Sequence, residues 1–175
     1  MTSSESATHA GDAPAVLAED IGHLMGHVAH ALGTREMVAL HDLGLTLRSY
    51  GTLAVVAEAG RTQAEVAAVT GIDRTTMVAI VDDLEARGLL TRSPAPGDRR
   101  AHHLQTTEAG TRLAACARDL VRRIEAEALA DLTAAERGQL HALLTRLAAG
   151  ALAAPVDLAH LPMATRRRPS AGRLS

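Results

Sequence analysis

The sequence predicts a mainly helical protein with one small β-hairpin, and three observations indicate this fold class. Ala and Leu, which favour helices, supply 36 and 24 of the 175 residues, whereas Phe and Trp are absent. Apolar residues recur at helical spacing in several segments, most of which open with a Thr or Asp that can cap a helix. Two short segments of strand character flank a turn-rich stretch at residues 94–100.

The chain is expected to begin with two amphipathic helices. The first covers residues 15 to about 35. Its apolar residues are three or four positions apart and form one stripe: Leu17, Ile21, Leu24, Val28 and Leu32. Residues 41–44 form a connection, after which Thr46 caps a second helix that continues to about Ala59, where Gly60 ends it.

A pair of helices joined by a glycine turn follows. Thr62 and Glu65 form the capping box of a short helix that ends at Gly71 and has Val66 and Val69 inside. Asp73 caps a longer helix that continues to Arg87. Four residues form the predicted buried stripe of this longer helix: Met77, Ile80, Val81 and Leu84. Such a pair is typical of a helix-turn-helix, although many helical proteins contain tight helix pairs.

Two strand candidates directly after this pair give the motif its winged form. They cover residues 89–93 and 101–106, and the charged turn 94–100 joins them. Helices from Thr107 to about Leu129 and from Thr133 to about Leu152 complete the predicted elements. The predicted architecture is therefore a winged helix-turn-helix flanked by long helices.

The composition excludes or disfavours several classes of function. The single cysteine, Cys116, rules out an internal disulfide and a site of several thiolates, and its mid-helix position predicts a small core residue. No apolar run has the length of a membrane span and residues 1–14 do not resemble a secretory signal, so a cytoplasmic protein without membrane contact is expected. With a net charge of −2, nucleic-acid binding must depend on local charge. No nucleophile–base pair or phosphate loop is recognisable, so an enzyme is not expected.

Five motifs in a fixed order resemble a known family. They are Leu43-Gly-Leu-Thr46, Gly71-Ile-Asp-Arg-Thr-Thr76, Val81-Asp-Asp-Leu-Glu-Ala-Arg-Gly-Leu-Leu-Thr-Arg92, Asp98-Arg-Arg100 with Thr107-Glu-Ala-Gly110, and Leu132-Thr-Ala-Ala-Glu136. In this order and spacing the set resembles the MarR family of winged helix-turn-helix transcriptional regulators, over roughly residues 17–147.

The resemblance implies a homodimer that binds a palindromic operator in double-stranded DNA. It implies dimerisation helices at residues 15–45 and 107–154 and a winged DNA-binding domain at residues 46–106. Residues 1–14 are expected to be a disordered tail and residues 155–175 a flexible Arg-rich tail. The family is controlled by a small ligand, a metal or thiol oxidation, so a repressor that is released by a small effector and needs no cofactor is expected.

The resemblance places the longer helix of the pair in the major groove of DNA, with its first turn nearest the bases. That turn holds three candidate contacts: Arg74, Thr75 and Thr76. Thr76 also has an alternative role at its own helix end, while Val78 and Ala79 can contact thymine methyl groups. Together with Asp83, these two apolar residues stand where many family members carry polar or basic side chains. Gln63, at the start of the preceding helix, is a candidate phosphate contact.

The turn between the two strand candidates is expected to contribute much of the DNA affinity. By resemblance, Arg100 enters the minor groove, Asp98 braces it by a salt bridge, and Arg99 meets phosphate. Residues 87–100 contain four Arg and one acidic residue, which gives a local net charge of +3. A solvated charged turn is the alternative interpretation.

By resemblance to the family, the expected effector site is a cleft between the first two helices and the winged domain. Tyr50, Met25 and His41 are its candidate residues, and a small phenolic or apolar compound is the expected ligand; core packing is an equally good role for Tyr50. A possible zinc site comprises four residues at the start of the first helix: Glu19, His23, His27 and His30. A polar helix face, or imidazoles packed at the dimer seam, is the alternative interpretation of these residues.

Two alternative functions remain open at this point. The shortage of basic residues in the middle of the longer helix is compatible with a winged-helix protein-interaction module that has little affinity for DNA. The histidine face of the first helix is compatible with a zinc-responsive regulator of the same family.

Overall fold

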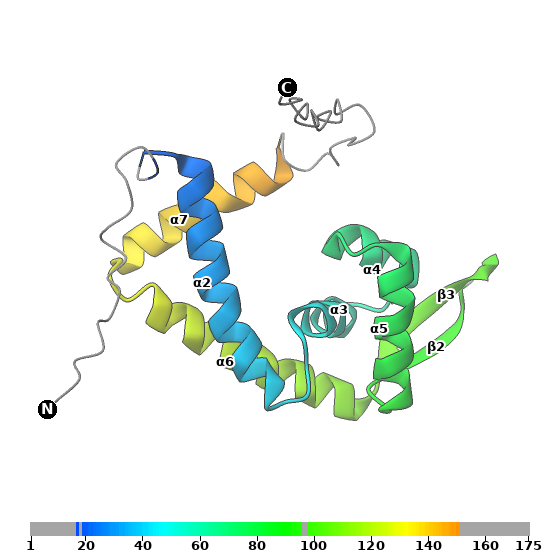
Figure 1. The fold of residues 1–175 in the computed structure, drawn as a ribbon. Helices are drawn as coiled ribbons and strands as arrows, with labels where there is room; N and C mark the ends of the chain where they lie inside the picture. Colours follow the sequence, from blue (N-terminus) through cyan, green and yellow to red (C-terminus); the bar gives the residue numbers. More distant parts are fainter. Residues whose placement is uncertain (1–16, 18, 96–97, 151–175) are drawn as a thin grey trace, which may run out of the picture. The chain divides into compact units, whose positions relative to one another are not determined.

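The computed structural model describes Leu17 and residues 19–95 and 98–150 (Figure 1). The helices with described bounds are α2 (Ile21–His41), α3 (Leu47–Glu58), α4 (Gln63–Thr70), α5 (Arg74–Ala86), α6 (Glu108–Ala128) and α7 (Ala134–Ala149). The strands are β1 (Arg61–Thr62), β2 (Leu90–Ala95) and β3 (Asp98–Thr106). The chain divides into two compact units, one that ends at Ala130 and one that starts at Asp131 and contains α7. The predicted class, mainly helical with a small β-wing, is confirmed.

Local capping explains where most helices begin. Five predicted caps are confirmed: Thr46, Thr62, Asp73, Thr107 and Thr133. In the capping box at the start of α4, the Thr62 N–H donates to Glu65 Oε2 at 2.7 Å, and the Glu65 N–H donates to Thr62 Oγ1 at 3.3 Å. Because these bonds join residues only three positions apart, the sequence alone predicts the starts of these helices well.

The core of the first unit lies where α3 packs on α5 and α6 and where these three helices pack on the sheet. Its largest fully buried side chains are Leu40, Thr52, Leu53, Val66, Met77, Val81, Leu84, Leu90 and Leu104. The predicted stripe of α5 is confirmed, with Ile80 only partly buried. Small residues allow close approach without aromatic rings: a Cβ at Gly110 of α6 would lie 2.0 Å from the carbonyl oxygen of Leu89.

The three strands form an antiparallel sheet in the order β1-β3-β2. Strand β1, which pairs Arg61 with Leu104 and Thr62 with His103, was not predicted. Two residues are too few to show the alternation that identifies a strand, and their pairing partners lie about forty residues further along the chain. Strand β3 begins at Asp98, earlier than predicted, because it continues its pairing with β2 up to Ala95.

The first helix differs most from the prediction. Asp20 caps α2, which therefore begins at Ile21 rather than at residue 15, and α2 continues to His41 instead of ending near residue 35. Its predicted apolar stripe is exposed: Ile21 is 73%, Leu24 45% and Val28 53% exposed.

Two smaller predictions were wrong. Val69, predicted to lie inside the short helix α4, is 61% exposed. Cys116 of α6 is exposed rather than in the core, because α6 buries a different stripe of residues, among them Ala114 and Ala117. None of the helices in the described ranges combines the length and apolar character that crossing a bilayer requires.

Candidate nucleic-acid interface

The first turn of α5 is exposed and well ordered by its cap. The Thr76 N–H donates to Asp73 Oδ1 at 2.9 Å, and hydrogen bonds from the side chain and N–H of Thr76 lower the pKa of Asp73. Arg74 and Thr75 are exposed, and Arg74 forms no ion pair with a described residue. Thr76 is half-buried and serves the helix end, while Arg74 and Thr75 can reach a ligand outside the protein.

The middle of α5 presents methyl groups and acidic side chains. Val78 is 40% exposed, and Ala79 is also exposed. Asp82 and Asp83 lie further along the helix, and both pair with arginines of this chain. This part of α5 therefore offers apolar contacts and no unpaired cation.

Arg92 of β2 is fixed to α5. Its guanidinium pairs with Asp82 and, through Nε at 3.2 Å from Oε2, with Glu85, and its side chain is only 20% exposed. We call β2, β3 and their connection the wing. These contacts hold its first strand, β2, against α5. The charge of Arg92 is therefore paired within the protein.

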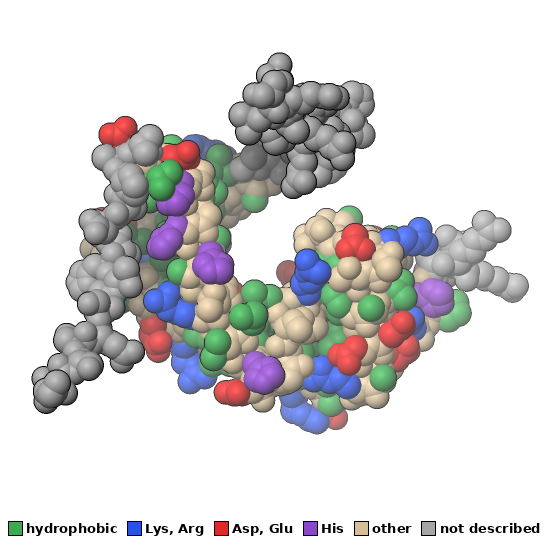
Figure 2. All heavy atoms as spheres, viewed as in Figure 1, with side chains coloured by type: hydrophobic (Ala, Val, Ile, Leu, Met, Phe, Trp, Pro, Cys, Tyr) green, Lys and Arg blue, Asp and Glu red, His purple; other side chains and the backbone are tan. Residues whose placement is uncertain are grey.

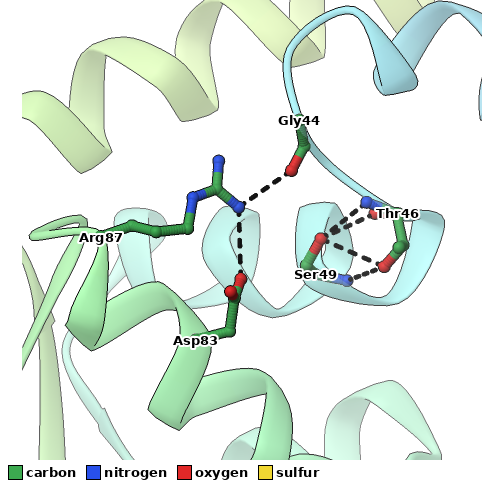
Figure 3. A network of polar contacts seen from close by, with 5 residues as sticks. All are labelled: Gly44, Thr46, Ser49, Asp83 and Arg87. Atoms are coloured by element: carbon green, nitrogen blue, oxygen red, sulfur yellow. Dashed lines mark hydrogen bonds and ion pairs between the residues drawn. The ribbon is translucent and has the colours of Figure 1, made fainter.

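Arg87, at the end of α5, is also engaged within the protein. Its Nη1 donates to the carbonyl oxygen of Gly44 at 2.9 Å and to Asp83 Oδ2 at 3.2 Å (Figure 3). Two of the four arginines behind the predicted local charge of +3 are thus paired with acidic side chains. The count over residues 87–100 leaves these partners out, because Asp82, Asp83 and Glu85 lie before residue 87 in the sequence but beside these arginines in the structure.

The tip of the wing is only partly described. The backbone of Asp98, Arg99 and Arg100 belongs to β3, but their side chains lie outside the described residues, so their DNA contacts stay predictions. Gln63 is the first residue of α4 and is half-buried. Acidic and Arg side chains are intermixed over the winged part of the first unit (Figure 2).

A groove of about 690 Å³ lies at the turn between α2 and α3. Its lining residues come from the end of α2, the turn and the start of α3: Met37, Val38, His41, Asp42, Leu45, Thr46, Leu47 and Arg48. The groove combines apolar side chains with two basic residues, His41 and Arg48, and one acidic residue, Asp42. This composition suits a small apolar compound that carries a polar or anionic group.

The structure does not bring the three predicted effector residues together. His41 lines the groove, but Tyr50 and Met25 do not. Tyr50 is half-buried and packs against the core, and burial raises the pKa of its hydroxyl, with Arg118 and Glu125 of α6 acting in opposite directions. Tyr50 therefore faces α6, and Met25 lies far from the groove because it precedes His41 by sixteen positions along α2.

The predicted zinc ligands are not assembled into a site. Glu19 precedes the cap of α2 and is therefore not on the helix face that carries the histidines. The rings of His23 and His27 stack with their centroids 6.5 Å apart, and His side chains gather over α2 (Figure 2). Within the described ranges, no group of three His, Cys, Asp or Glu side chains is arranged to hold a metal ion.

Sequence analysis missed three residues of this site. Arg48 lines the groove, and Arg87 and Arg92 pair with acidic side chains of this chain. A signal for Arg87 was present, because Asp83 lies four positions before it on one helix face. No comparable signal existed for Arg92, whose partners lie on a different element.

An exposed helix, a supporting helix and an adjacent β-hairpin are arranged here as in winged helix-turn-helix proteins that read duplex DNA. The profile of the MarR family matches residues 43–101 of this chain. Together with the similarities described next, this match shows that the chain belongs to the MarR family of DNA-binding transcriptional regulators and is not an enzyme. The predicted family is confirmed.

Three relatives cover much of the chain. The HTH-type transcriptional repressor NicR of Pseudomonas putida is 31% identical over 137 residues, which are 77% of this chain and 85% of NicR. The putative transcriptional regulatory protein for the hcr operon of Thauera aromatica is 38% identical over 105 residues, which are 59% of this chain and 63% of that protein. CouR of Rhodococcus jostii RHA1, solved with p-coumaroyl-CoA, superposes with a TM-score of 0.70 at 31% identity and covers 77% of this chain and 96% of CouR. CouR bound to a 23-mer DNA duplex gives a TM-score of 0.70 at 30% identity, with 82% of this chain and 99% of CouR covered.

Proposed function

We propose that the protein is a cytoplasmic, homodimeric repressor that binds a palindromic operator and releases it when a small effector fills the groove at the α2–α3 turn. The observation that carries the proposal is the exposed first turn of α5 beside the β2–β3 hairpin. Two relatives support it, since NicR is named a repressor and CouR has been solved on a DNA duplex.

The DNA contacts in this proposal fall on two surfaces. On the recognition helix α5, Arg74 and Thr75 contact bases or phosphate, and Val78 and Ala79 contact thymine methyl groups. Thr76 supports the cap. The remaining contacts come from the wing and the start of α4: Asp98, Arg99, Arg100 and Gln63. Arg99 and Arg100 carry most of the electrostatic affinity, since Arg87 and Arg92 are paired internally.

The dimer in this proposal forms through apolar side chains that the described residues leave uncovered. On α2 these are Ile21, Leu24, Met25 and Val28, each at least 40% exposed. On α7, in the second unit, they are Leu143, Leu144 and Leu147, each at least 44% exposed. Apolar surfaces of this kind mark protein–protein contacts, and a two-fold dimer matches a palindromic site.

The groove supports an effector that is phenolic or apolar and carries an anionic group. The apolar body packs on residues such as Val38 and Leu45, and the anion pairs with Arg48. CouR, with p-coumaroyl-CoA bound, is an example of a relative whose ligand has an aromatic and an anionic part. His41 is the second polar group that such a ligand meets.

Selection of binding sites from random duplexes tests the proposed DNA binding. The expected result is a palindromic consensus that the protein shifts in a gel, while a scrambled duplex of the same composition is not shifted. Arg74→Ala should lower operator affinity by about tenfold. Absence of any enriched sequence at low salt would favour the protein-interaction module instead.

Calorimetric titration with p-coumaroyl-CoA tests the groove. Arg48→Ala should weaken binding by about tenfold, because a charge-assisted hydrogen bond is lost. Arg35→Ala is the matched control, since Arg35 lies on α2 but does not line this groove. Equal affinities of wild type and both variants would place the ligand elsewhere, and an operator complex that survives saturating p-coumaroyl-CoA would contradict this ligand chemistry.

A further inference from the structure

We propose that Arg87 is a positioning residue that ties the end of the recognition helix to the rim of the groove, rather than a DNA contact. The proposal rests on the proposed function, because it concerns how operator affinity responds to the state of the groove. It is carried by the contacts of Arg87, Asp83 and Gly44 (Figure 3).

Arg87 joins two segments that are 43 residues apart in the chain. It is the C-cap of α5, and its N–H donates to the carbonyl oxygens of Asp83 and Glu85. Its Nη1 donates to the Gly44 carbonyl at 2.9 Å and to Asp83 Oδ2 at 3.2 Å. One guanidinium nitrogen therefore connects the last turn of the recognition helix with the turn between α2 and α3.

The turn that accepts this hydrogen bond forms the rim of the groove. Asp42, two positions before Gly44, and Leu45, directly after it, line the groove. The Gly44 N–H donates to His41 O at 2.8 Å, and the Leu45 N–H donates to Leu40 O at 3.0 Å, so the turn is held to the end of α2. Any displacement of the end of α2 is thereby transmitted to the Gly44 carbonyl.

The start of α3 fixes the other side of the turn. The Thr46 N–H donates to Ser49 Oγ at 2.8 Å, and the Ser49 N–H donates to Thr46 Oγ1 at 3.1 Å. This capping box leaves little freedom between Gly44 and α3. A ligand that contacts His41 and Arg48 thus acts on a segment with defined bonds on both sides.

Gly44 fits closely against Arg87. Its φ of +65° is a conformation that favours glycine, and a Cβ there would lie 3.2 Å from Arg87 Nη2. A residue larger than glycine at position 44 is therefore strained by its φ and requires the end of the Arg87 guanidinium to shift by a few tenths of an ångström. This contact allows the link to be tested without any ligand.

A positioning role and a phosphate contact predict different salt dependence. Log affinity falls with log salt, and loss of a phosphate contact makes this negative slope shallower by about one unit. Lysine replaces arginine acceptably at such a site. Loss of a positioning contact lowers affinity at every salt concentration without changing the slope. Lysine does not restore it, because a single ammonium on a flexible chain does not reproduce the planar guanidinium.

The first experiment measures operator affinity of wild type, Arg87→Gln, Arg87→Lys and Asp83→Asn at several salt concentrations. Arg87→Gln and Arg87→Lys should each weaken binding by about fivefold with an unchanged slope, and Asp83→Asn should weaken it less, since the Gly44 bond remains. A salt slope that becomes shallower by about one unit in Arg87→Gln, together with rescue by lysine, would overturn the proposal in favour of a phosphate contact. Circular dichroism and melting temperatures identify any variant that fails to fold, and Asp83→Asn is the milder second variant.

The second experiment is a double-mutant cycle between Gly44→Ala and Arg87→Gln, read out as operator affinity. Gly44→Ala should weaken binding more in the wild-type background than when Arg87 is already Gln, because the backbone strain at position 44 acts in both backgrounds and the contact with Arg87 acts only in one. Equal effects in both backgrounds would show that the two residues are not linked. If the wild type itself binds no duplex, the proposed function fails; if it binds and the variants match it, only the role of Arg87 fails.

Discussion

At the level of single residues, the partners of an arginine decide what its charge can bind. The sequence places four arginines between residues 87 and 100, and proximity in the chain suggested one basic surface. Arg92 pairs instead with Asp82 and Glu85, which lie on α5, and this is a consequence of β2 packing against that helix. The same holds for Tyr50. As an aromatic residue it was expected to contact a ligand, but its position on α3 turns its side chain toward α6.

Arg92 and Arg100 should therefore differ when each is replaced by Ala. Arg92→Ala should lower the free energy of unfolding by roughly 1 kcal/mol, since both of its ion pairs are partly exposed, and should leave the salt slope of operator binding unchanged. Arg100→Ala should make that negative slope shallower by about one unit and hardly affect the free energy of unfolding. Urea denaturation and binding at several salt concentrations measure the two quantities.

The Arg112–Glu108 pair provides the control for Arg92. Both side chains of this i,i+4 pair are more than two-thirds exposed, so Arg112→Ala should change the free energy of unfolding by less than about 0.5 kcal/mol. If Arg92→Ala altered the salt slope and left stability unchanged, Arg92 would be a DNA contact after all.

At the level of elements, local capping signals in the sequence predicted where helices begin. Pairing between distant segments could not be predicted in this way. The capping boxes at Thr62 and Thr133 and the cap at Asp73 are completed within three residues, and all three were predicted. Strand β1 depends on pairing with β3 and gave no local pattern. The end of α2 was placed too early, because its last turn is stabilised by burial of Leu40 in the core rather than by a cap that sequence reveals.

The caps also predict how stability depends on pH. Hydrogen bonds from the N–H and hydroxyl of Thr62 lower the pKa of Glu65 below its ordinary value. A carboxylate with a lowered pKa in the folded state stabilises the fold above its unfolded pKa, and this contribution is lost as the pH falls through its folded pKa. The melting temperature of wild type should exceed that of Glu65→Gln near neutral pH, and the difference should shrink between about pH 5 and about pH 3.

A second carboxylate serves as the control for Glu65. Glu58 is exposed at the end of α3 and takes no part in a capping box, so the difference between wild type and Glu58→Gln should vary little over the same pH range. A difference for Glu65→Gln that stays constant down to pH 3 would show that its charge does not contribute to the cap.

At the level of the whole molecule, the sequence predicted the family and the amphipathic character of the first helix, but not which part of that helix is covered. The C-terminal half of α2 packs on α3 and α6, whereas the apolar residues near its start remain exposed. Periodicity identifies an apolar stripe and does not distinguish an internal partner from a second chain. The exposed stripe therefore supports a homodimer, and the oligomeric state is the property that tests it.

Val28 and Val69 allow this test with one type of substitution. Both are exposed apolar residues, at 53% and 61%, but Val28 lies in the proposed dimer surface and Val69 lies on α4. Val28→Glu should shift the protein from dimer to monomer in sedimentation velocity and weaken operator binding strongly, because a charge buried in an apolar interface is costly and a monomer binds only one half-site. Val69→Glu should remain a dimer at the same concentration. If Val28→Glu also remained dimeric, the exposed start of α2 would not be the contact between subunits, and the two-fold match to a palindromic operator would require a different surface.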